Sequence, residues 1–298
     1  MKIFLYKIVL FVVPVLVLFE ILFRLGFSPI VTNSMLFDFK MLEARKHHVK
    51  NVKLLSVGSS IGLYELNSGV IVKNLKMPYY NFASWGMTIA DMRVLLNSLV
   101  KEYKPKYVII CSSLGDFMTT PNDSYLNYVS TNSYIRNNFP EFFYFKNYNS
   151  IHQLFIRKYE AYHLDFDKWG GASLTIKQKD INRDKWNEHF IFPTAYTQGQ
   201  YKELDTLGAF LKEQNIGFIF VQAPIKASYT NTPLAEQIVK LHFDKCKSIV
   251  GNQGGIYLNY YNTTVFTDSL FFDQSHLQAE GSVILTQEIV ADLKTIIK

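Results

Sequence analysis

A serine near the start of the chain and an Asp-His pair near its end are the residues whose types and spacing could do acid–base chemistry. Ser60 lies in the stretch VGSSIG, where Gly58 and Gly62 bracket it in the pattern G-x-S-x-G. Asp273 precedes His276 by three residues in FFDQSHLQAEG. An imidazole held by a carboxylate can take the proton of a serine hydroxyl and turn it into a nucleophile. Together the three residues predict nucleophilic catalysis at Ser60.

Each half of this pattern also has a structural explanation, which the sequence leaves open. Gly-Ser turns commonly connect a strand to a helix, and Ser59 stands beside Ser60 as a second hydroxyl. Asp273 could cap the helix that follows it and place His276 in the first turn. One aspartate and one histidine are too few ligands for a metal site, so we predict no metal and no cofactor. The remaining histidines are interpreted as solvated or structural: His47, His48, His152, His163, His189 and His242.

These residues stand within an alternating series of strand-like and helix-like segments. Apolar runs predict strands over 53–57, 79–83, 107–112, 217–222 and 256–258. Apolar residues at helical spacing predict helices over 62–75, 89–103, 233–249 and 281–297. Strands separated by helices imply right-handed crossovers and a parallel sheet that is covered on both faces. Active sites of such sheets lie at the carboxyl ends of the strands, and Ser60 directly follows the first strand.

One long interval, from about 121 to 199, breaks this alternation. It is rich in aromatic residues and contains the run FPEFFYF as well as Trp169 and Trp186. We expect an insertion at the edge of the sheet or above its carboxyl end, where it would form a lid or a platform for a substrate. A small subdomain that uses these aromatic residues for its own core is an equal alternative.

The composition describes a folded protein with a basic surface. Of 298 residues, 48% are hydrophobic and 19% are charged, which is sufficient for a large core. The net charge of +6 suits an anionic partner such as a membrane or an acidic glycan. The chain has no compact Lys/Arg cluster and no nucleic-acid motif, so nucleic acid is excluded as a partner. Cys111 ends an apolar run and is predicted to be a buried free thiol, while a disulfide with Cys246 stays open.

The N-terminus predicts a membrane anchor. An apolar run from Ile8 to Phe19 lies in MKIFLYKIVLFVVPVLVLFEILFRLGF, and a helix over 3–23 would be roughly 31 Å long, which matches a bilayer core. A cleaved signal peptide has the same basic start and apolar centre, but no A-x-A-like cleavage site follows the run. A buried core helix preceded by lysines is the weakest of the three explanations. We therefore expect an uncleaved anchor.

The charges beside the anchor predict its orientation. Lys2 and Lys7 favour a cytoplasmic N-terminus and place the remainder of the chain outside the cytoplasm. We expect a single-pass protein of the cell membrane with an anchor over 1–27, a juxtamembrane linker over 28–52 and an extracytoplasmic domain over 53–298.

The chemical residues and their order resemble those of the SGNH hydrolases, the GDSL-like esterase superfamily. The first block of that family is a Gly-Asp-Ser-like turn, for which this chain has Gly58-Ser59-Ser60. Its fifth block is Asp-x-x-His, here Asp273 and His276 followed by LQAEG. The resemblance covers the domain after the linker, apart from the insertion. It implies a flavodoxin-like three-layer α/β/α sandwich with a parallel sheet and a Ser-His-Asp catalytic triad.

Two further blocks concern the oxyanion. The stretch NFASWGMT resembles the second block, with Asn81 at its start and Gly86 at the oxyanion glycine. The third block normally reads Gly-x-Asn-Asp, and its asparagine donates to the oxyanion. Here SSLGDF places Gly115 directly before Asp116, so that donor is missing. The resemblance implies oxyanion or substrate-binding roles for these four positions, and the loss of one donor costs about 3–4 kcal/mol of transition-state stabilisation.

The pattern G-x-S-x-G also occurs in the α/β-hydrolase fold, which has the same chain order of Ser, Asp and His. It normally places several strands before the serine and a longer segment between the acid and the histidine. Neither feature is present here, so we prefer the SGNH resemblance.

The topology narrows the expected activity further. Membrane-anchored SGNH proteins with an external domain resemble the alginate O-acetylation proteins and the D-alanyl transfer protein of teichoic-acid assembly. Those proteins act with a multi-span membrane O-acyltransferase. The resemblance implies an esterase or acyltransferase that handles acyl groups, with acetyl expected, on a cell-envelope or exported polysaccharide. A non-catalytic glycan-binding or assembly protein on a degenerate SGNH scaffold is the alternative that Gly115 and the aromatic insertion favour.

Overall fold

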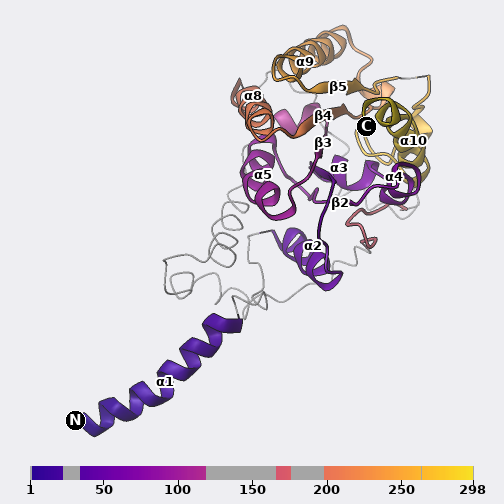
Figure 1. The fold of residues 1–298 in the computed structure, drawn as a ribbon. Helices are drawn as coiled ribbons and strands as arrows, with labels where there is room; N and C mark the ends of the chain where they lie inside the picture. Colours follow the sequence, from indigo (N-terminus) through magenta and orange to yellow (C-terminus); the bar gives the residue numbers. More distant parts are fainter. Residues whose placement is uncertain (1, 23–33, 119–165, 176–197, 263, 298) are drawn as a thin grey trace. The chain divides into compact units, whose positions relative to one another are not determined.

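The computed structural model describes residues 2–22, 34–118, 166–175, 198–262 and 264–297 (Figure 1). The chain divides into two compact units, and Glu43 begins the second of them. That second unit carries the sheet and all residues of the predicted site. Most of the insertion predicted over 121–199 lies outside the described residues.

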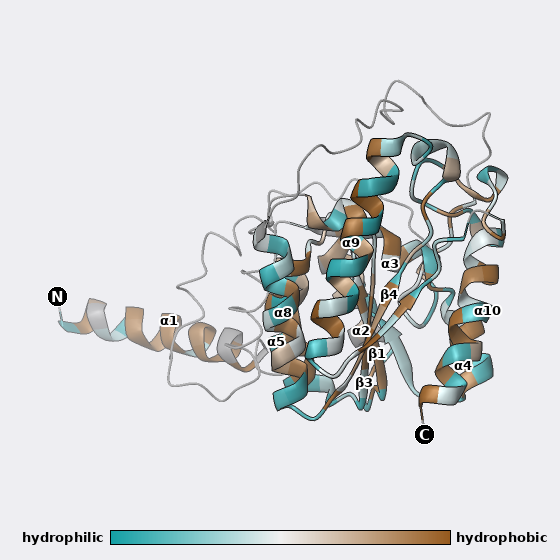
Figure 2. Ribbon diagram, turned by 90° about the horizontal axis from the view of Figure 1, so that it is seen from above, coloured by the Kyte–Doolittle hydropathy of each residue, from teal (hydrophilic) through white to brown (hydrophobic). Residues whose placement is uncertain are grey.

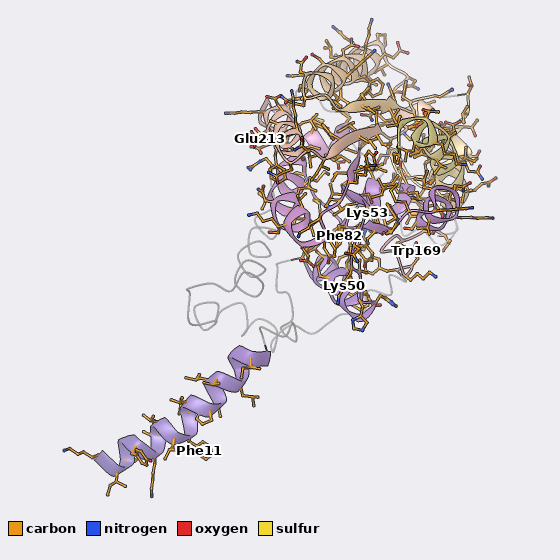
Figure 3. All side chains as sticks on the ribbon, viewed as in Figure 1. Phe11, Lys50, Lys53, Phe82, Trp169 and Glu213 are labelled. Carbon is orange, nitrogen blue, oxygen red and sulfur yellow. The ribbon has the colours of Figure 1, made fainter. Side chains whose placement is uncertain are left out.

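The N-terminal residues form helix α1, Lys2–Leu22, which contains Pro14. Its apolar side chains are largely exposed, and that of Phe11 is 81% exposed (Figure 3). In the part of the chain that the structure describes, no helix combines the length and the apolar character needed to cross a membrane. Helix α2, Met35–Lys46, lies within the range predicted as a linker.

Five parallel strands form the sheet in the order β2-β1-β3-β4-β5. The predicted parallel α/β sheet is therefore confirmed, and its strand order is that of flavodoxin-like folds. Four strands are buried apart from a half-buried first residue in two of them, as expected where helices cover both faces, and the edge strand near the C-terminus is half-buried to exposed. The strands are β1 (Leu54–Gly58), β2 (Tyr79–Asn81), β3 (Tyr107–Ser112), β4 (Gly217–Gln222) and β5 (Ile256–Asn259).

Helices cover the sheet in two layers, which Figure 2 shows on its two sides. One layer holds α5 (Ile89–Tyr103), α8 (Gln198–Glu213) and α9 (Pro233–Asn252), which contact one another in that order. The other holds α3 (Ser60–Glu65), α4 (Ser68–Leu75) and α10 (Ala279–Ile296). Short 3-10 turns are η2 (Leu114–Phe117), η5 (Ala227–Tyr229) and η6 (Asp268–Leu270). The predicted α/β/α layering is confirmed.

The helix predicted over 62–75 is two helices, and the reason is a cap. Leu66 has extended backbone angles and ends α3. The next residue, Asn67, accepts a hydrogen bond from the backbone N–H of Val70 at 3.0 Å and starts α4. A capping asparagine satisfies a free N–H group at a new helix start, and it does so at the cost of continuing the first helix.

Helix α8 is absent from the elements predicted from the sequence. Its buried side chains stand three or four residues apart, a helical spacing, at Tyr201, Leu204, Leu207 and Leu211. This helix begins where the predicted insertion ends, and no element was predicted from the sequence between the insertion and the strand at 217–222. Both cysteines are buried and free, which confirms the prediction for Cys111.

The described part of the predicted insertion, 166–175, is tied to the sheet and helices by backbone hydrogen bonds. Asn81 donates to the carbonyl of Trp169 at 2.8 Å, and Ala172 donates to the carbonyl of Leu63 at 3.2 Å. Ala279, at the start of α10, donates to the carbonyl of Leu174 at 2.9 Å. The segment therefore runs from β2 past α3 to α10, beside the predicted site.

Candidate active site

The turn between β1 and α3 positions Ser60. β1 ends at Gly58, and Ser59 caps α3 by accepting a hydrogen bond from the N–H of Ile61 at 3.1 Å, which makes Ser60 the first residue of the helix. A Cβ on Gly58 would stand 2.5 Å from the carbonyl oxygen of Cys111 and 2.9 Å from the Cα of Gly62. Only glycine permits this approach of strand and helix, and the serine hydroxyl consequently lies at the carboxyl end of the sheet.

The loop before α10 holds the acid and the base in a tight turn. Phe271 and Leu277 form an antiparallel bridge across it, and Phe272 donates its N–H to the carbonyl of His276 at 2.7 Å. Inside the loop, Asp273 Oδ1 accepts the N–H groups of Ser275 at 2.9 Å and of His276 at 2.8 Å. The aspartate therefore organises the loop as well as facing the imidazole. The alternative that it caps the following helix is wrong, because α10 begins at Ala279 after Gln278 and His276 lies before its first turn.

The structure brings Ser60, His276 and Asp273 into one hydrogen-bonded chain. Ser60 Oγ lies 2.8 Å from His276 Nε2, and His276 Nδ1 lies 2.8 Å from Asp273 Oδ2. With a proton on Nδ1, the imidazole donates to the carboxylate and accepts from the serine hydroxyl. This is the arrangement in which a base can activate the serine.

The environment keeps Asp273 ionised. Burial by itself would raise its pKa, but the hydrogen bond from His276 and the charge of that ring lower it below the ordinary value of 3.8. The backbone N–H groups of Ser275 and His276 act in the same direction. An ionised partner fixes the ring tautomer and stabilises the imidazolium that forms when the serine gives up its proton.

Ser60 and His276 line a cavity of about 370 Å³. Three of the four residues predicted for the oxyanion or substrate lie in its wall, namely Gly86, Gly115 and Asp116. Gly86 has a φ of +67°, a conformation that favours glycine. Gly115 stands where the SGNH resemblance implies an asparagine, and it has no side chain that could donate a hydrogen bond to an oxyanion.

Asp116 is a buried carboxyl group in this wall. Its Oδ2 accepts from Ser112 Oγ at 2.8 Å and from the N–H of Ser113 at 3.1 Å. Burial raises its pKa to about 6, against the opposing hydrogen bonds from Ser59, Ser112 and Ser113 and the charge of His276. The carboxyl group therefore titrates close to the triad.

Asn81 does not belong to the cavity wall, and its predicted role in substrate binding is not supported. The side chain is fully buried. Its Nδ2 donates to the carbonyl of Gly62 at 2.8 Å, and its Oδ1 accepts the N–H of Ala83 at 2.9 Å. Because both ends of the amide are engaged with backbone, Asn81 holds α3 against the loop after β2 and cannot also reach a substrate.

Sequence reasoning missed a second buried acid, Glu65, at the end of α3. It is fully buried, and that burial, with the negative charges of Asp273 and Asp116 added, raises its pKa well above the ordinary value. Its position in a short helix carries no sequence signal, because burial of a glutamate depends on what packs around it.

Ser60 and His276 also line a smaller cavity, whose other residues were not predicted from the sequence. This cavity of about 170 Å³ is lined by Tyr64, Trp85, Leu174 and Phe272 in addition to the two triad members. Trp85 and Phe272 stand inside the motifs NFASWG and FFDQSH, so their nearness in sequence to Gly86 and Asp273 was the available signal.

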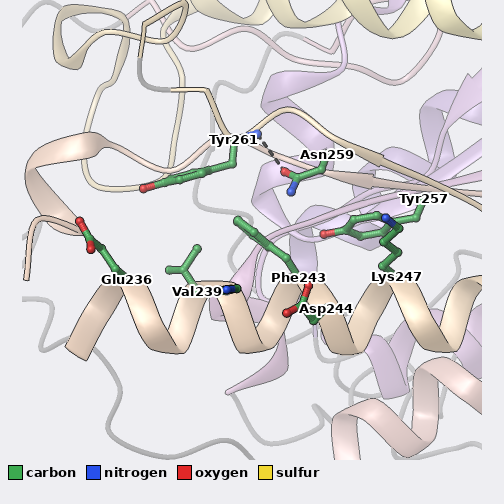
Figure 4. Close-up of a pocket in the computed structure, with 9 residues that line it drawn as sticks. Glu236, Val239, Phe243, Asp244, Lys247, Tyr257, Asn259 and Tyr261 are labelled. Atoms are coloured by element: carbon green, nitrogen blue, oxygen red, sulfur yellow. Dashed lines mark hydrogen bonds between the residues drawn. The ribbon is translucent and has the colours of Figure 1, made fainter. Parts of the chain in front are cut away.

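A larger cavity, of about 520 Å³, lies away from the triad, between α9 and β5 (Figure 4). Asn259 there accepts the N–H of Tyr261 at 3.0 Å, and Phe243 packs against the Tyr261 ring. None of the predicted site residues lines it. Among the described residues, no group of three or more His, Cys, Asp or Glu side chains is arranged to hold a metal ion.

No protein-family model matches the chain, and no curated protein matches it. Among solved structures it is similar to an α/β hydrolase enzyme from the metagenome of Lake Arreo, Spain, at 11% identity and a TM-score of 0.46, over 85% of this chain and 99% of that chain. It is similar to a catalytic mutant of an acetylxylan esterase from Geobacillus stearothermophilus, at 13% identity and a TM-score of 0.48, over 82% and 94%. A GDSL-like lipase from Bacteroides thetaiotaomicron matches at 11% identity and a TM-score of 0.44, over 86% and 99%. The chemistry of the site rests on its own geometry.

Proposed function

We propose that this protein is a serine esterase or acyltransferase that acts on O-acyl esters. The observation that carries the proposal is the chain of two 2.8 Å contacts from Ser60 through His276 to Asp273, with the serine and the histidine in a cavity wall. Nucleophile, base and orienting acid are all within hydrogen-bonding distance, which is the geometric requirement for acyl transfer through a serine.

The reaction proceeds in two halves. His276 Nε2 takes the proton of Ser60, whose Oγ attacks the ester carbonyl, and Asp273 stabilises the imidazolium. The tetrahedral intermediate collapses as the imidazolium gives its proton to the departing alcohol, which leaves an acyl group on Ser60. An acceptor hydroxyl then loses its proton to His276 and attacks the acyl-serine, and the acyl–Oγ bond breaks as the imidazolium returns that proton to Ser60. Water as the acceptor makes an esterase, and a sugar hydroxyl makes an acyltransferase.

The oxyanion of the intermediate would be held by backbone donors. The N–H of Ser60 lies at the first turn of α3, and Gly86 lies in the same cavity wall. The side-chain donor that the SGNH resemblance implies is replaced by Gly115, so stabilisation of the oxyanion is weaker by the share of one donor, about 3–4 kcal/mol.

For the substrate we propose an acylated carbohydrate of the cell envelope or an exported polysaccharide, with acetyl as the smallest acyl group. Support comes from the sequence resemblance to membrane-anchored SGNH proteins and from the basic net charge of +6. A multi-span O-acyltransferase as partner and attachment to the cell membrane stay predictions from the sequence. Recovery of the full chain in the membrane fraction after a high-salt wash would support attachment, and recovery in the soluble fraction would contradict it.

Labelling with a serine-reactive fluorophosphonate tests the proposal directly. Full-length wild type should label, Ser60→Ala should not, and Ser248→Ala, an exposed serine of α9, should label as wild type does. Failure of wild type to label beside a control esterase would reject the enzyme and favour the non-catalytic glycan-binding alternative. Labelling that survives in Ser60→Ala would reject the nucleophile.

The direction of acyl transfer is tested in cells. The O-acyl content of surface polysaccharide is measured in a deletion strain complemented with wild type or Ser60→Ala. Loss of acyl groups on deletion, restored only by wild type, indicates a transferase, and a gain indicates an esterase. An unchanged content with both variants would remove polysaccharide acylation from the proposal.

A further inference from the structure

Two cavities of different character share Ser60 and His276 as wall residues. The larger, of about 370 Å³, has apolar wall residues such as Ile61, Leu114 and Ile225, and it also has polar ones, namely Ser113, Asp116, Gln274 and Ser275. The smaller has a volume of about 170 Å³. Apart from Ser60 and His276, the polar side-chain groups among its described lining residues are a tyrosine hydroxyl and an indole N–H. An ester has two arms on either side of its carbonyl group, and the reaction at Ser60 needs a place for each.

Among the side chains of its other four lining residues, the smaller cavity has one indole N–H and one phenol hydroxyl, and these two are bonded to each other. Trp85 Nε1 donates to the hydroxyl of Tyr64 at 2.7 Å. Tyr64 is only 6% exposed, and its ring meets the His276 ring edge-on at 6.1 Å between centroids. Apart from Ser60 and His276, the cavity therefore offers carbon surface and one remaining donor, the O–H of Tyr64. Most positions in it would leave a sugar hydroxyl without a hydrogen-bond partner, which is costly.

The remaining walls of the smaller cavity are held in place by backbone. Phe272 is 6% exposed and donates its N–H to the carbonyl of His276. The carbonyl of Leu174 accepts the N–H of Ala279, at the beginning of α10. A wall whose members are tied to the catalytic loop and to a helix start is built to keep its size, and size is what discriminates among chains that differ only in length.

We propose that the smaller cavity, walled by Tyr64, Trp85, Leu174 and Phe272, binds the acyl chain of the ester and selects chains longer than acetyl. The larger cavity binds the alcohol arm. The inference rests on the proposed function, because it assigns the two arms of that function's substrate.

The volume sets the expected chain length. A water-sized group takes about 30 Å³, and a methylene is of comparable size, so a cavity of about 170 Å³ has room for about five of them. Together with the carbonyl carbon, this corresponds to an acyl chain of about six carbons. The single methyl of an acetyl group would leave most of the cavity unfilled.

A series of p-nitrophenyl esters from acetate to decanoate tests this with one common leaving group. We expect kcat/KM of the full-length protein to rise about fourfold for each added methylene up to about hexanoate, and to fall for longer chains. A maximum at acetate, or a profile without dependence on chain length, would overturn the inference.

Substitutions at the wall assign the effect to this cavity. Leu174→Trp fills it and should lower the hexanoate-to-acetate ratio of kcat/KM at least tenfold, whereas Leu174→Ala enlarges it and should move the maximum to longer chains. The matched variant, Ile225→Trp, places the same bulk in the larger cavity and should leave that ratio within about twofold. A ratio that falls with Ile225→Trp and not with Leu174→Trp would show that the acyl chain lies in the larger cavity.

Failure of the inference and failure of the proposed function are distinguishable. A protein that neither labels with fluorophosphonate nor cleaves any ester of the series lacks the proposed function. A protein that labels at Ser60 and cleaves esters with a flat chain-length profile keeps the function and loses the inference. Should Leu174→Trp fail to fold, the shift expected with Leu174→Ala decides the case.

Discussion

Two histidines of the second unit each have a hydrogen-bond partner at both ring nitrogens, but the partners and the surroundings differ. His276 lies between Asp273 and Ser60 at the wall of two cavities, and its side chain is 20% exposed. His242, on α9, lies between the Tyr201 hydroxyl at 2.9 Å from Nδ1 and Gln222 Oε1 at 3.0 Å from Nε2, and it is fully buried. Hydrogen bonds at both ring nitrogens therefore do not by themselves make a catalytic histidine.

The difference lies in the charge of the partner and in access to a ligand. Burial lowers the pKa of His242 to about 3, so that ring is neutral, and its partners are a neutral phenol and a neutral amide. At the other site an ionised carboxylate faces the ring and can stabilise a positive imidazolium. A proton can be taken up at His276 during a reaction, whereas at His242 it would be a buried charge without compensation.

The largest effect is expected when His276 is given a neutral partner like that of His242. Asp273→Asn removes the charge and permits the wrong ring tautomer, so kcat/KM for a p-nitrophenyl ester should fall by about 10⁴-fold. His47→Ala, at an exposed histidine outside the site, serves as the control and should retain wild-type kcat/KM. A loss of less than tenfold in Asp273→Asn would show that the carboxylate does not serve the base.

The reverse change removes the buried histidine. His242→Leu removes the hydrogen bonds that the ring makes with the Tyr201 hydroxyl and with Gln222 Oε1 in a buried place, which should lower the free energy of unfolding by about 2–5 kcal/mol. Urea unfolding measures this, and kcat/KM per folded molecule should stay within a few-fold of wild type. A His242→Leu protein that is fully stable but inactive would contradict the structural role.

Acid adds a second readout at the same residue. The folded-state pKa of His242 lies below its ordinary value of 6.5, so its contribution to stability is complete above pH 6.5 and is lost as pH falls towards 3. The loss approaches about 1.4 kcal/mol per pH unit in that window. The free energy of unfolding of His242→Leu should therefore depend less steeply on pH below 6.5 than that of wild type.

Asp116, near His276, changes the stability with pH in the opposite direction to His242, because its pKa in the folded state is raised above the ordinary value. Its folded-state pKa is raised from 3.8 to about 6, so its contribution is present below pH 3.8 and is lost as pH rises through 6, by up to about 3 kcal/mol. Asp116→Asn should gain stability relative to wild type between pH 4 and 7 in urea unfolding. The exposed Asp244→Asn serves as control, and equal pH profiles of Asp116→Asn and wild type would refute the shift.

The smallest effect is expected at a pair outside both histidine sites. Arg93 on α5 and Glu203 on α8 form a partly exposed ion pair. Arg93→Gln should cost about 0.2–1 kcal/mol of unfolding free energy and should lose this effect in high salt. A cost as large as that of His242→Leu would mean that charge pairs between helices, and not buried hydrogen bonds, dominate stability in this unit.

Some elements follow from local signals and were predicted closely. β3 and β4 are apolar runs that begin and end as predicted, because a strand buried on both faces needs little beyond such a run. α5 also has its predicted bounds. Thr88 and Asp91 form a capping box at its start, and Lys104 ends it in a left-handed conformation.

Other elements depend on partners far away in the chain. The single helix predicted over 62–75 is divided at the Asn67 cap, and the N–H of this residue donates to Thr286 of α10, a contact that no local pattern records. Asn81 was assigned to the oxyanion from its place in a motif, yet its amide holds two backbone groups. The position of a residue in a motif indicates where its backbone lies in the fold, but it does not determine which groups its side chain hydrogen-bonds.

The sequence by itself determined the short-range half of the candidate site. Asp273 and His276 stand three residues apart, and a carboxylate at that spacing can hold both the turn and the ring. Ser60 follows a strand, so it lies at the carboxyl end of the sheet. Only the tertiary structure decided that Ser60 and His276, 216 residues apart, meet at 2.8 Å. It also decided that His242 and Asp116 are buried, and that Leu174 completes a cavity beside the serine. Burial and long-range contact arise from packing between elements, and that packing sets the pKa values and the cavities.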